Sequence, residues 1–437
     1  MNVGMAVEAI AKVREVARVG ADRRGVTGWV LYDLANTIFS LNIVSLYFSL
    51  WVVDDMGGRD GDYLIANSIS MALMFLTAPL LGALSDQTPR RMPFLIVTTV
   101  VCCFFTALLG TGGLLVSLIF FVIANYFYQG GLIFYDALLP SVSTEETRGR
   151  ISGLGVSIGY IGSLIGIGMG LVVTSIDESA KPVVFRLTAL LFLLFALPCF
   201  FWVKERRKVD AVGFGRESLR RAWKELGTNA RRVRRYPNLT RFLVGRVFYT
   251  DAANTLIAVI GIYGTKEIGF SDAEVQSILL VGIVGSVAGG LIWGRWVDQY
   301  SPRWALDRVL VLWALLLLGT AAIGIFDLPR HLFWIIGLFA GFSLAGTWAA
   351  DRPLMLRLTP PRYLGAFYGL YAMVGRFAAI IGPLLWTVIV DALGWGRPAA
   401  ILSLCVMVLI SMVIIRGVND SRTDWDQTEL PTASANA

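Results

Sequence analysis

The ten residues Gly82-Ala-Leu-Ser-Asp-Gln-Thr-Pro-Arg-Arg91 recur in outline later in the same chain. There the sequence reads Gly294-Arg-Trp-Val-Asp-Gln-Tyr-Ser-Pro-Arg303, with glycine, aspartate, proline and arginine in the same order. In both places this polar segment separates two long apolar runs. A polar segment that is repeated between apolar runs indicates a membrane protein built by tandem duplication.

Two further matches support the duplication. Asp33-Leu-Ala-Asn-Thr37 recurs as Asp251-Ala-Ala-Asn-Thr255, and a spaced set recurs with Asp136 matching Asp351. The glycines of that set are Gly149, Gly153 and Gly159 in the first copy, and Gly365, Gly369 and Gly375 in the second. All three matches appear in the same order, which chance would hardly produce, so we interpret the chain as two copies of one unit.

The composition places both copies in a membrane. Of 437 residues, 56% are hydrophobic and 16% are charged, against about 25% charged in ordinary soluble domains. The mean hydropathy is +0.66. Apolar runs long enough to cross a bilayer, about 20 residues each, therefore decide the architecture.

The hydropathy predicts twelve membrane spans in two groups of six, an all-α polytopic fold. The spans lie at 28–52, 62–84, 92–112, 114–140, 150–175, 183–203, 241–264, 274–297, 305–326, 331–350, 363–391 and 397–416. The predicted domains are an N-terminal segment (1–27), a first six-helix bundle (28–203), a basic linker (204–240), a second six-helix bundle (241–416) and a disordered tail (417–437). The N-terminal segment has apolar residues at helical spacing, which favours a short amphipathic helix on the membrane surface; a frayed tail is the alternative.

Loop charges set the predicted orientation. Between Lys204 and Arg235 there are twelve basic residues against four acidic ones. Alternate loops also carry basic pairs, whereas the opposite loops are short and acidic. Because basic loops stay on the cytoplasmic side, we expect both termini in the cytoplasm and a location in the cell membrane.

Several classes of function are disfavoured. The net charge of +7 resides largely in the linker, and no nucleic-acid-binding motif accompanies it. The four cysteines lie in apolar runs and His331 is the one histidine of the chain, so the sequence predicts no metal site and no cofactor. No nucleophile–histidine arrangement indicates an enzyme.

Polar residues recur at helical spacing on the first, fourth, seventh and tenth spans. Such groups are costly in a bilayer and usually face a cavity or the bundle interior. We therefore predict a central substrate and proton pathway. Its residues are Asp33, Asn36, Ser40, Asn125, Gln129, Asp136, Asp251, Asn254, Asp351 and Arg376.

The arginines within the spans allow several interpretations. Arg376 lies about twelve residues into its span, so it needs a carboxylate partner, such as Asp251 or Asp351, or a place facing the cavity. Arg246 lies near the start of its span, and we expect it to extend towards the membrane surface. Two interpretations are open for Asp136 and Asp351: they take part in transport chemistry, or they form structural ion pairs with Arg150, Arg352 or Arg357.

Asp33 is the predicted proton-coupling carboxylate. No basic residue lies one turn away on its own span, and burial favours the protonated carboxyl. The alternative is a structural pair with a basic group such as Arg150. Asp251 is its counterpart in the second copy, where Arg246, five residues earlier, would hold it ionised.

The fifth span carries seven glycines between Gly153 and Gly170, and the eighth has five between Gly282 and Gly294. Small residues at this spacing let helix backbones approach closely in lipid. The two spans are predicted partners, either in fixed packing or as a smooth surface on which the two copies rock.

The segment at 82–91 resembles the loop between the second and third helices of the major facilitator superfamily. Gln87 and Pro89 depart from that family's usual arginine and glycine. The resemblance implies a twelve-helix transporter with a cytoplasmic latch between its halves. The latch residues it implies here are Asp86, Arg90, Arg91, Arg148, Arg150 and Asp298.

A narrower resemblance is carried by Tyr32-Asp-Leu-Ala-Asn-Thr-Ile-Phe39, by Phe134-Tyr-Asp-Ala-Leu-Leu-Pro140 and by residues 148–160. These segments are similar to the vacuole-effluxer branch, whose yeast member is implicated in releasing amino acids from the vacuole. Asp136 stands where asparagine is expected in that branch.

The expected function is alternating-access transport of a small polar solute, with an amino acid favoured by the resemblance and protons as a possible coupling ion. The expected partners are the solute and the lipid bilayer, and we expect the chain to act as a monomer. The alternatives are a sugar, lysolipid or drug transporter, or a membrane receptor or scaffold without transport.

Overall fold

The computed structural model describes residues 22–205, 215, 218, 220–223, 232–377 and 381–421. The predicted helix of the N-terminal segment and most of the predicted disordered tail lie outside these residues. Within them the chain is helical, without strands. Eleven helices are long and apolar enough to cross a membrane, and Met92–Ala107 is a shorter apolar one, so the all-α prediction is confirmed.

The first six spans follow the predicted order. The first comprises α2 (Arg23–Phe39) with the continuing segments η1 (Ser40–Leu46), α3 (Tyr47–Leu50) and η2 (Trp51–Asp55). The others are α4 (Asp60–Gln87), α5 (Met92–Ala107), α6 (Gly113–Ala137), α8 (Arg148–Ile176) and α9 (Lys181–Trp202), with the short α7 (Leu139–Val142) and η3 (Glu178–Ala180) in loops.

The last six spans are α11 (Pro237–Lys266), α12 (Asp272–Gln299), α13 (Pro302–Ile325), α14 (Leu332–Leu358), a composite span and α17 (Arg397–Arg416). The composite span comprises α15 (Leu364–Phe377), α16 (Ile381–Thr387) and η6 (Val388–Ala392). Single turns, η4 (Val233–Arg235) and η5 (Pro361–Tyr363), precede α11 and α15.

The third span is shorter than predicted. We expected it to run from 92 to 112, but α5 ends at Ala107. Gly110, Gly112 and Gly113 have φ values of +82°, +75° and +84°, a left-handed backbone that glycine adopts readily and other residues do not. This run of glycines forms the turn into α6.

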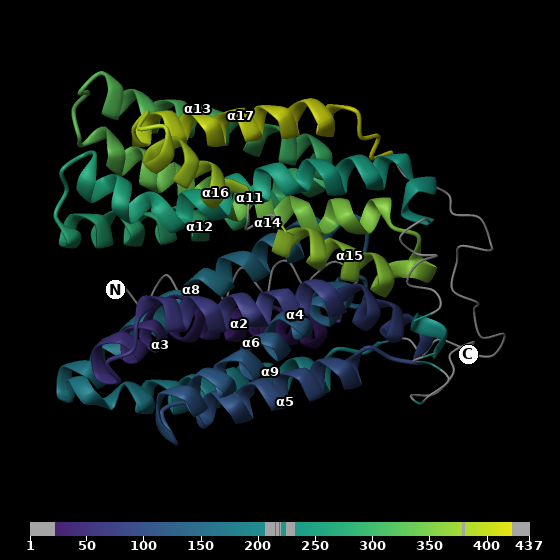
Figure 1. Ribbon diagram of the computed structural model, residues 1–437. Helices are drawn as coiled ribbons and strands as arrows, with labels where there is room; N and C mark the ends of the chain where they lie inside the picture. Colours follow the sequence, from purple (N-terminus) through teal and green to yellow (C-terminus); the bar gives the residue numbers. More distant parts are fainter. Residues whose placement is uncertain are drawn as a thin grey trace.

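The helices of each half pack mainly on one another, as Figure 1 shows with the purple and blue helices below and the green and yellow ones above. In the first half α2 packs on α8 and α9; in the second α11 packs on α17 and α12 on α14. The halves meet where α8 contacts α12 and α14, and where α4 contacts α15. The boundaries of the two bundles stay a prediction.

The contact between the halves depends on glycine. An ideal Cβ on Gly153 of α8 would lie 2.0 Å from the carbonyl oxygen of Gly290 on α12. A Cβ on Gly82 of α4 would lie 2.1 Å from the carbonyl oxygen of Gly365 on α15. No side chain fits at either position, so the predicted pairing of the fifth and eighth spans is found, and the repeat adds a second, equivalent contact.

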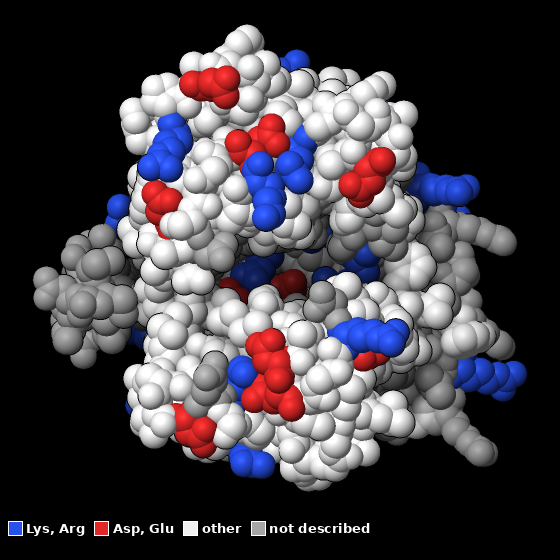
Figure 2. Space-filling model, turned by 60° about the vertical axis from the view of Figure 1, so that its left-hand side comes forward, with Lys and Arg blue, Asp and Glu red and all other residues white. Residues whose placement is uncertain are grey.

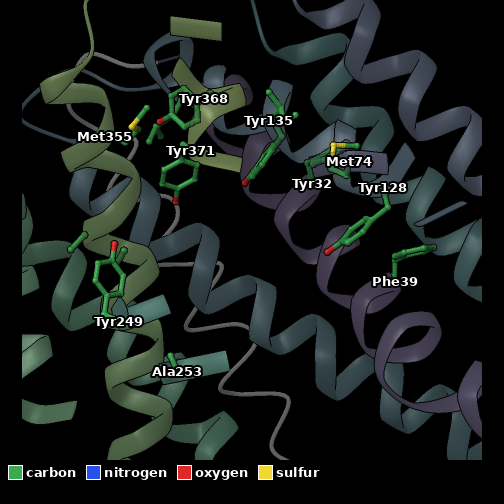
Figure 3. Packing of buried hydrophobic residues seen from close by; sticks show 14 of the residues in the cluster. Tyr32, Phe39, Met74, Tyr128, Tyr135, Tyr249, Ala253, Met355, Tyr368 and Tyr371 are labelled. Atoms are coloured by element: carbon green, nitrogen blue, oxygen red, sulfur yellow. The ribbon is translucent and has the colours of Figure 1, made fainter. Parts of the chain in front are cut away.

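Aromatic side chains fill the interior beside the contact between the halves (Figure 3). In the first half Tyr32 stacks on Tyr135, with ring centroids 4.9 Å apart, and Phe39 lies against Tyr128 at 4.5 Å. In the second half Tyr368 and Tyr371 pack edge to face at 5.5 Å.

The two ends of the molecule differ. We call the end that carries Arg23, Trp202, Pro237 and Arg416 the linker end, because the first half finishes and the second begins there. It lies on the right in Figure 1. The opposite end, which we call the open end, has a hollow between the two halves, visible in Figure 2.

Candidate functional site

A cavity of about 490 Å³ lies between the two halves. This volume is within the range of small-molecule sites, about 300–1,000 Å³. Residues of α2, α6 and α8 line one side, and residues of α11, α14 and α15 line the other. Its charged residues are Asp33, Asp136, Arg246, Arg352 and Arg376. Figure 2 shows red and blue atoms deep in the hollow.

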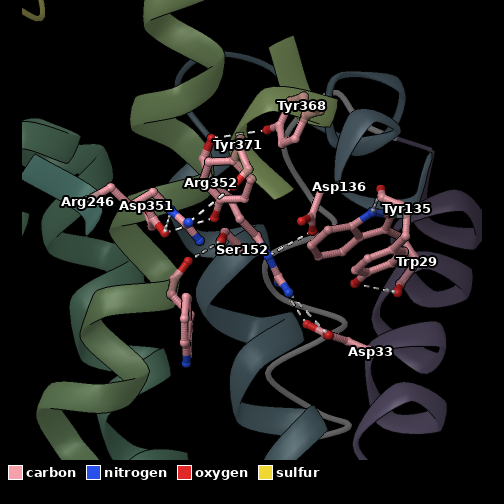
Figure 4. A network of polar contacts seen from close by, with 11 residues as sticks. Trp29, Asp33, Tyr135, Asp136, Ser152, Arg246, Asp351, Arg352, Tyr368 and Tyr371 are labelled. Atoms are coloured by element: carbon pink, nitrogen blue, oxygen red, sulfur yellow. Dashed lines mark hydrogen bonds and ion pairs between the residues drawn. The ribbon is translucent and has the colours of Figure 1, made fainter. Parts of the chain in front are cut away.

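Arg352 joins the two halves at the floor of the cavity (Figure 4). Its Nη1 lies 2.9 Å from Oδ2 of Asp33 on α2, and its Nε lies 3.0 Å from Oδ1 of Asp136 on α6. Arg352 belongs to α14, so one guanidinium from the second half holds two carboxylates of the first. The predicted pairing of Asp136 with a nearby arginine is found, but Asp33 pairs with Arg352 rather than with Arg150.

A pair of aromatic rings supports this bridge. Trp29 and Tyr135 stack with centroids 4.6 Å apart, and the indole N–H of Trp29 donates to the carbonyl oxygen of Tyr135 at 3.2 Å. The guanidinium of Arg352 lies 5.7 Å from the Trp29 ring and 5.6 Å from the Tyr135 ring. Arg352 therefore gains cation–π attraction as well as two ion pairs.

A second buried pair lies within the second half. Arg246 Nε donates to Oδ2 of Asp351 at 2.9 Å, and the hydroxyls of Tyr249 and Tyr371 donate to the same carboxylate at 2.6 Å and 2.8 Å. The guanidinium also lies 3.7 Å from the centroid of the Tyr371 ring. Arg246 is 4% exposed, so our expectation that it extends to the membrane surface is wrong; Asp351 draws it inward.

Arg376 faces the cavity with no carboxylate at ion-pair distance among the described residues. Its Nη2 donates to Oε1 of Gln129 on α6, and its buried Nε has no hydrogen-bond partner within the described part of the chain. Of the two predicted environments, the cavity is found and a pairing with Asp251 or Asp351 is not.

The remaining predicted pathway residues separate into two groups. Asn36, Ser40, Gln129 and Asn254 line the cavity along with the charged residues already described. Asn125, Asp251 and Asp351 do not. Local contacts hold these three residues outside the cavity, as described above for Asp351.

Asn125 supports Gln129 from behind. Gln129 Nε2 donates to Oδ1 of Asn125 at 3.3 Å. Asn125 Nδ2 in turn donates to Oγ of Ser70 at 2.7 Å and to Oδ1 of Asn67 at 3.0 Å. The chain of contacts orients the amide of Gln129 so that its oxygen meets Arg376.

Asp251 lies outside the cavity wall. Its Oδ2 accepts the backbone N–H of Gly382 at 2.7 Å. Arg246, which we expected to hold Asp251 ionised, binds Asp351 instead. Asp251 therefore differs from Asp33, its counterpart in the repeat, because no arginine among the described residues lies at ion-pair distance from it.

Two aspartates close the linker end by equivalent contacts. Asp86 of the first half accepts the backbone N–H groups of Gly365 and Ala366, at 2.9 Å and 2.8 Å, at the start of α15. Asp298 of the second half accepts those of Gly149 and Arg150, at 2.7 Å and 3.1 Å, at the start of α8. A carboxylate at a helix N-terminus satisfies free N–H groups and complements the helix dipole.

The basic residues of the predicted latch have different surroundings. Arg150 Nε reaches Asp298 across the halves at 2.7 Å. Arg91 contacts Asp86 at 2.7 Å and Glu205 at 3.6 Å, both on its own side. Arg90 is exposed and Arg148 is half-buried at the first residue of α8. Backbone N–H groups thus form much of the contact between the halves that the resemblance assigns to charged side chains.

Our sequence analysis placed Arg376 in the pathway but missed the other cavity residues of its helix. Tyr368 and Ala372 precede Arg376 at four-residue spacing on α15 and line the cavity with it, as does Tyr371. Such a stripe marks one helix face, so its signal was present in the sequence. Tyr160 and Trp348 also line the cavity, and isolated aromatic residues carry no such signal.

The comparisons with known proteins agree with this geometry. The family described as "Vacuole effluxer Atg22 like" matches residues 62–428. YxiO of Bacillus subtilis, an MFS-type transporter by its description, is 26% identical over 92% of this chain and 96% of its own. Autophagy-related protein 22-1 of Penicillium rubens is 25% identical over 63% of this chain, which spans about half the length of that relative.

Solved structures resemble the fold. FucP, a major facilitator superfamily transporter in an outward conformation, superposes with a TM-score of 0.72 at 13% identity, over 92% of this chain and 98% of its own. The human organic anion transporter MFSD10 superposes with a TM-score of 0.68 at 19% identity, over 90% and 99%. At these identities the likeness concerns the fold.

Proposed function

Since the chain belongs to the Atg22-like family of vacuole effluxers, transporters of the major facilitator superfamily, we propose that it is a secondary active transporter for a small zwitterionic solute, with amino acids favoured. The solute binds in the cavity between the halves, which then exchange access from one end to the other. The observation that carries the proposal is the uneven pairing of the charges around that cavity.

These charges leave one site for an anion and one for a cation. Arg376 faces the cavity without a carboxylate among the described residues, whereas Asp33 and Asp136 share the single guanidinium of Arg352. A buried charge without a partner is unfavourable. A solute with a carboxylate near Arg376 and an ammonium group near Asp33 supplies both missing partners, and guanidinium–carboxylate contacts are strong.

The separation of the two sites bears on the size of the solute. Gln129, which contacts Arg376, lies seven residues before Asp136 on α6, or about 10 Å along a helix axis. The α-carboxylate and the α-ammonium of any amino acid share one carbon, so this separation favours an amino acid with a long cationic side chain, or a short peptide, over glycine.

One alternative has a specific observation behind it. Arg376 by itself suits an organic anion, and MFSD10 is an organic anion transporter by its description. An anion without an amino group would leave the excess negative charge at Asp33 and Asp136 unmatched. We therefore prefer the zwitterion.

The asymmetry of the two ends supports alternating access. The linker end is closed by Asp86, Asp298 and the Arg352 bridge, each of which joins the halves. If the linker and both termini are cytoplasmic, as the loop charges predict, this is an outward-open state of a cell-membrane protein. The two predicted bundles, 28–203 and 241–416, would be the moving bodies.

Counterflow in proteoliposomes tests the proposal. Vesicles loaded with one unlabelled solute at high concentration are diluted into a trace of the same labelled solute. We expect label to enter for amino acids with long cationic side chains or for short peptides, and not for fucose, lysophosphatidylcholine or a monocarboxylate. Entry of the monocarboxylate alone would favour the organic anion. Entry of the sugar or the lysolipid would overturn the zwitterion, and no entry for any solute would favour a receptor or scaffold.

A further inference from the structure

Asp251 is a carboxylate in the middle of α11 that forms no ion pair with the described basic residues. It is 0% exposed. Its Oδ2 accepts the N–H of Gly382 at 2.7 Å, whereas its Oδ1 has no hydrogen-bond partner within the described part of the chain. Asp33 and Asp351 also lie within spans, but each has an arginine nitrogen 2.9 Å from a carboxylate oxygen.

The charged groups near Asp251 either contact other residues or lie far from Asp251 along their helices. On the elements packed against the middle of α11, Arg246 binds Asp351, Arg352 binds Asp33, and Arg376 contacts Gln129. The remaining charged side chains described on α12, α14, α17 and η6 lie near the ends of their spans: Glu274, Arg295, Asp298, Arg357, Asp391, Arg397 and Arg416. None of these described groups is at ion-pair distance from Asp251.

A second unpaired oxygen lies beside the carboxylate. Thr255, one turn further along α11, is 1% exposed, and its Oγ1 also has no hydrogen-bond partner among the described residues. A Cβ on Gly382 would lie 2.0 Å from that Oγ1 and 3.1 Å from Oδ1 of Asp251. Glycine at this position therefore leaves both oxygens facing the same small space.

An ionised carboxylate cannot remain buried in this state at low cost. Moving a carboxylate from water into the protein interior costs several kcal/mol unless a positive charge compensates it. The compensation here has to come from a bound species. A proton on the carboxyl, or a sodium ion between the carboxylate and the hydroxyl oxygen, supplies it.

We infer that Asp251 and Thr255 form the binding site of a monovalent coupling cation, either a proton or a sodium ion. This inference rests on the proposed transport function. It replaces Asp33, which we expected from the sequence to carry the coupling proton. Asp33 neutralises Arg352 instead, and a carboxylate held in an ion pair gives up its charge less readily.

The site is positioned to communicate with the solute. Thr250 and Asn254, neighbours of Asp251 and Thr255 on α11, line the cavity, so the cation site lies directly behind the cavity wall. Gly382 lies six residues after Arg376 on the same span. Because the N–H of Gly382 binds Asp251, a change of charge at Asp251 acts on the span that carries the arginine expected to bind the solute carboxylate.

The test compares two transport modes in one preparation. Counterflow needs no ion gradient, whereas accumulation against a solute gradient needs coupling. We expect the wild type to accumulate solute under either a pH gradient or a sodium gradient, and the effective gradient identifies the cation. Asp251→Asn should retain counterflow within about threefold and lose at least 90% of gradient-driven accumulation. Asp391→Asn, an exposed carboxylate on the composite span, is the control and should retain both modes.

A milder variant covers the case in which Asp251→Asn does not fold. Thr255→Val keeps the shape and removes the hydroxyl. It should shift the cation concentration for half-maximal accumulation about tenfold. The shift is upward for sodium, which loses an oxygen ligand, and downward for a proton, by about one pH unit, because a hydroxyl beside the carboxylate favours its ionised form.

Two results would overturn the inference. One is wild-type accumulation in Asp251→Asn or an unchanged midpoint in Thr255→Val. The other is counterflow by the wild type without accumulation under either gradient, which would leave the transport proposal intact and remove the coupling cation. Failure of wild-type counterflow would instead contradict the proposed function itself.

Discussion

The three arginines that face the cavity differ in what they neutralise. Arg352 and Arg246 hold buried aspartates, at 2.9 Å in each case. Arg376 has a neutral amide, Gln129, as its contact. Removing one member of a buried ion pair strands the other charge, which typically costs about 3–5 kcal/mol. Removing a charge that has no counterion leaves no other charge buried without its partner.

This difference predicts opposite behaviour for two alanine variants. Arg376→Ala should abolish counterflow and lower the melting temperature by no more than about 3 °C. Arg246→Ala should lower the melting temperature markedly, because Asp351 stays buried without its cation. Tryptophan fluorescence on heating in detergent, with counterflow on the same preparation, measures both. A strongly destabilised Arg376→Ala would show that the arginine has a structural counterion.

At the scale of elements, the first turns of α8 and α15 determine whether the linker end stays closed. Asp298 caps α8 and Asp86 caps α15, each from the opposite half. A helix cap typically contributes about 0.5–2 kcal/mol. These caps exist only while the halves touch, so their contribution belongs to the closed linker end rather than to folding.

Asp86→Ala should therefore shift the molecule towards the state that is open at the linker end, by about fivefold in population for 1 kcal/mol. A cysteine at Ser152, a buried position on α8, should react faster with a thiol reagent in this background. A cysteine at Ser45, which lines the cavity, should react more slowly. Equal rates with and without Asp86→Ala would contradict a role of the cap in closure.

The glycine contact between α8 and α12 gives a matched pair of variants on one helix. Gly153→Ala places a methyl group 2.0 Å from the carbonyl oxygen of Gly290, so the halves cannot meet and counterflow should fall at least tenfold. Gly168→Ala meets nothing within 4 Å and should leave counterflow unchanged, while alanine is the better helix former by about 1 kcal/mol. Equal activity of the two variants would mean that α8 and α12 need not touch during transport.

At the scale of the whole molecule, the charge of the loops predicts its orientation in the membrane. The linker between the halves is the most basic segment, and basic loops stay cytoplasmic. A cysteine at Arg220, an exposed linker position, should react with a membrane-impermeant reagent in inverted vesicles and not in intact cells. Labelling in intact cells would reverse the orientation and make the observed cavity inward-facing.

The number and order of the spans, the duplication and most of the polar face of the cavity were predictable from the amino-acid sequence. These properties follow from local information: runs of apolar residues cross a bilayer, and residues three or four apart share a helix face. Asp33, Asn36 and Ser40 could be placed together in this way, and they line the cavity.

Which charges pair with one another became clear only from the packing of the helices. Arg352 pairs with Asp33, 319 residues away in the sequence, and Arg246 pairs with Asp351 rather than with the nearer Asp251. An arginine within a membrane needs a carboxylate, but the sequence offers each arginine several. The choice depends on how helices of the two halves pack, because the energy of an ion pair falls steeply when water or distance separates the charges.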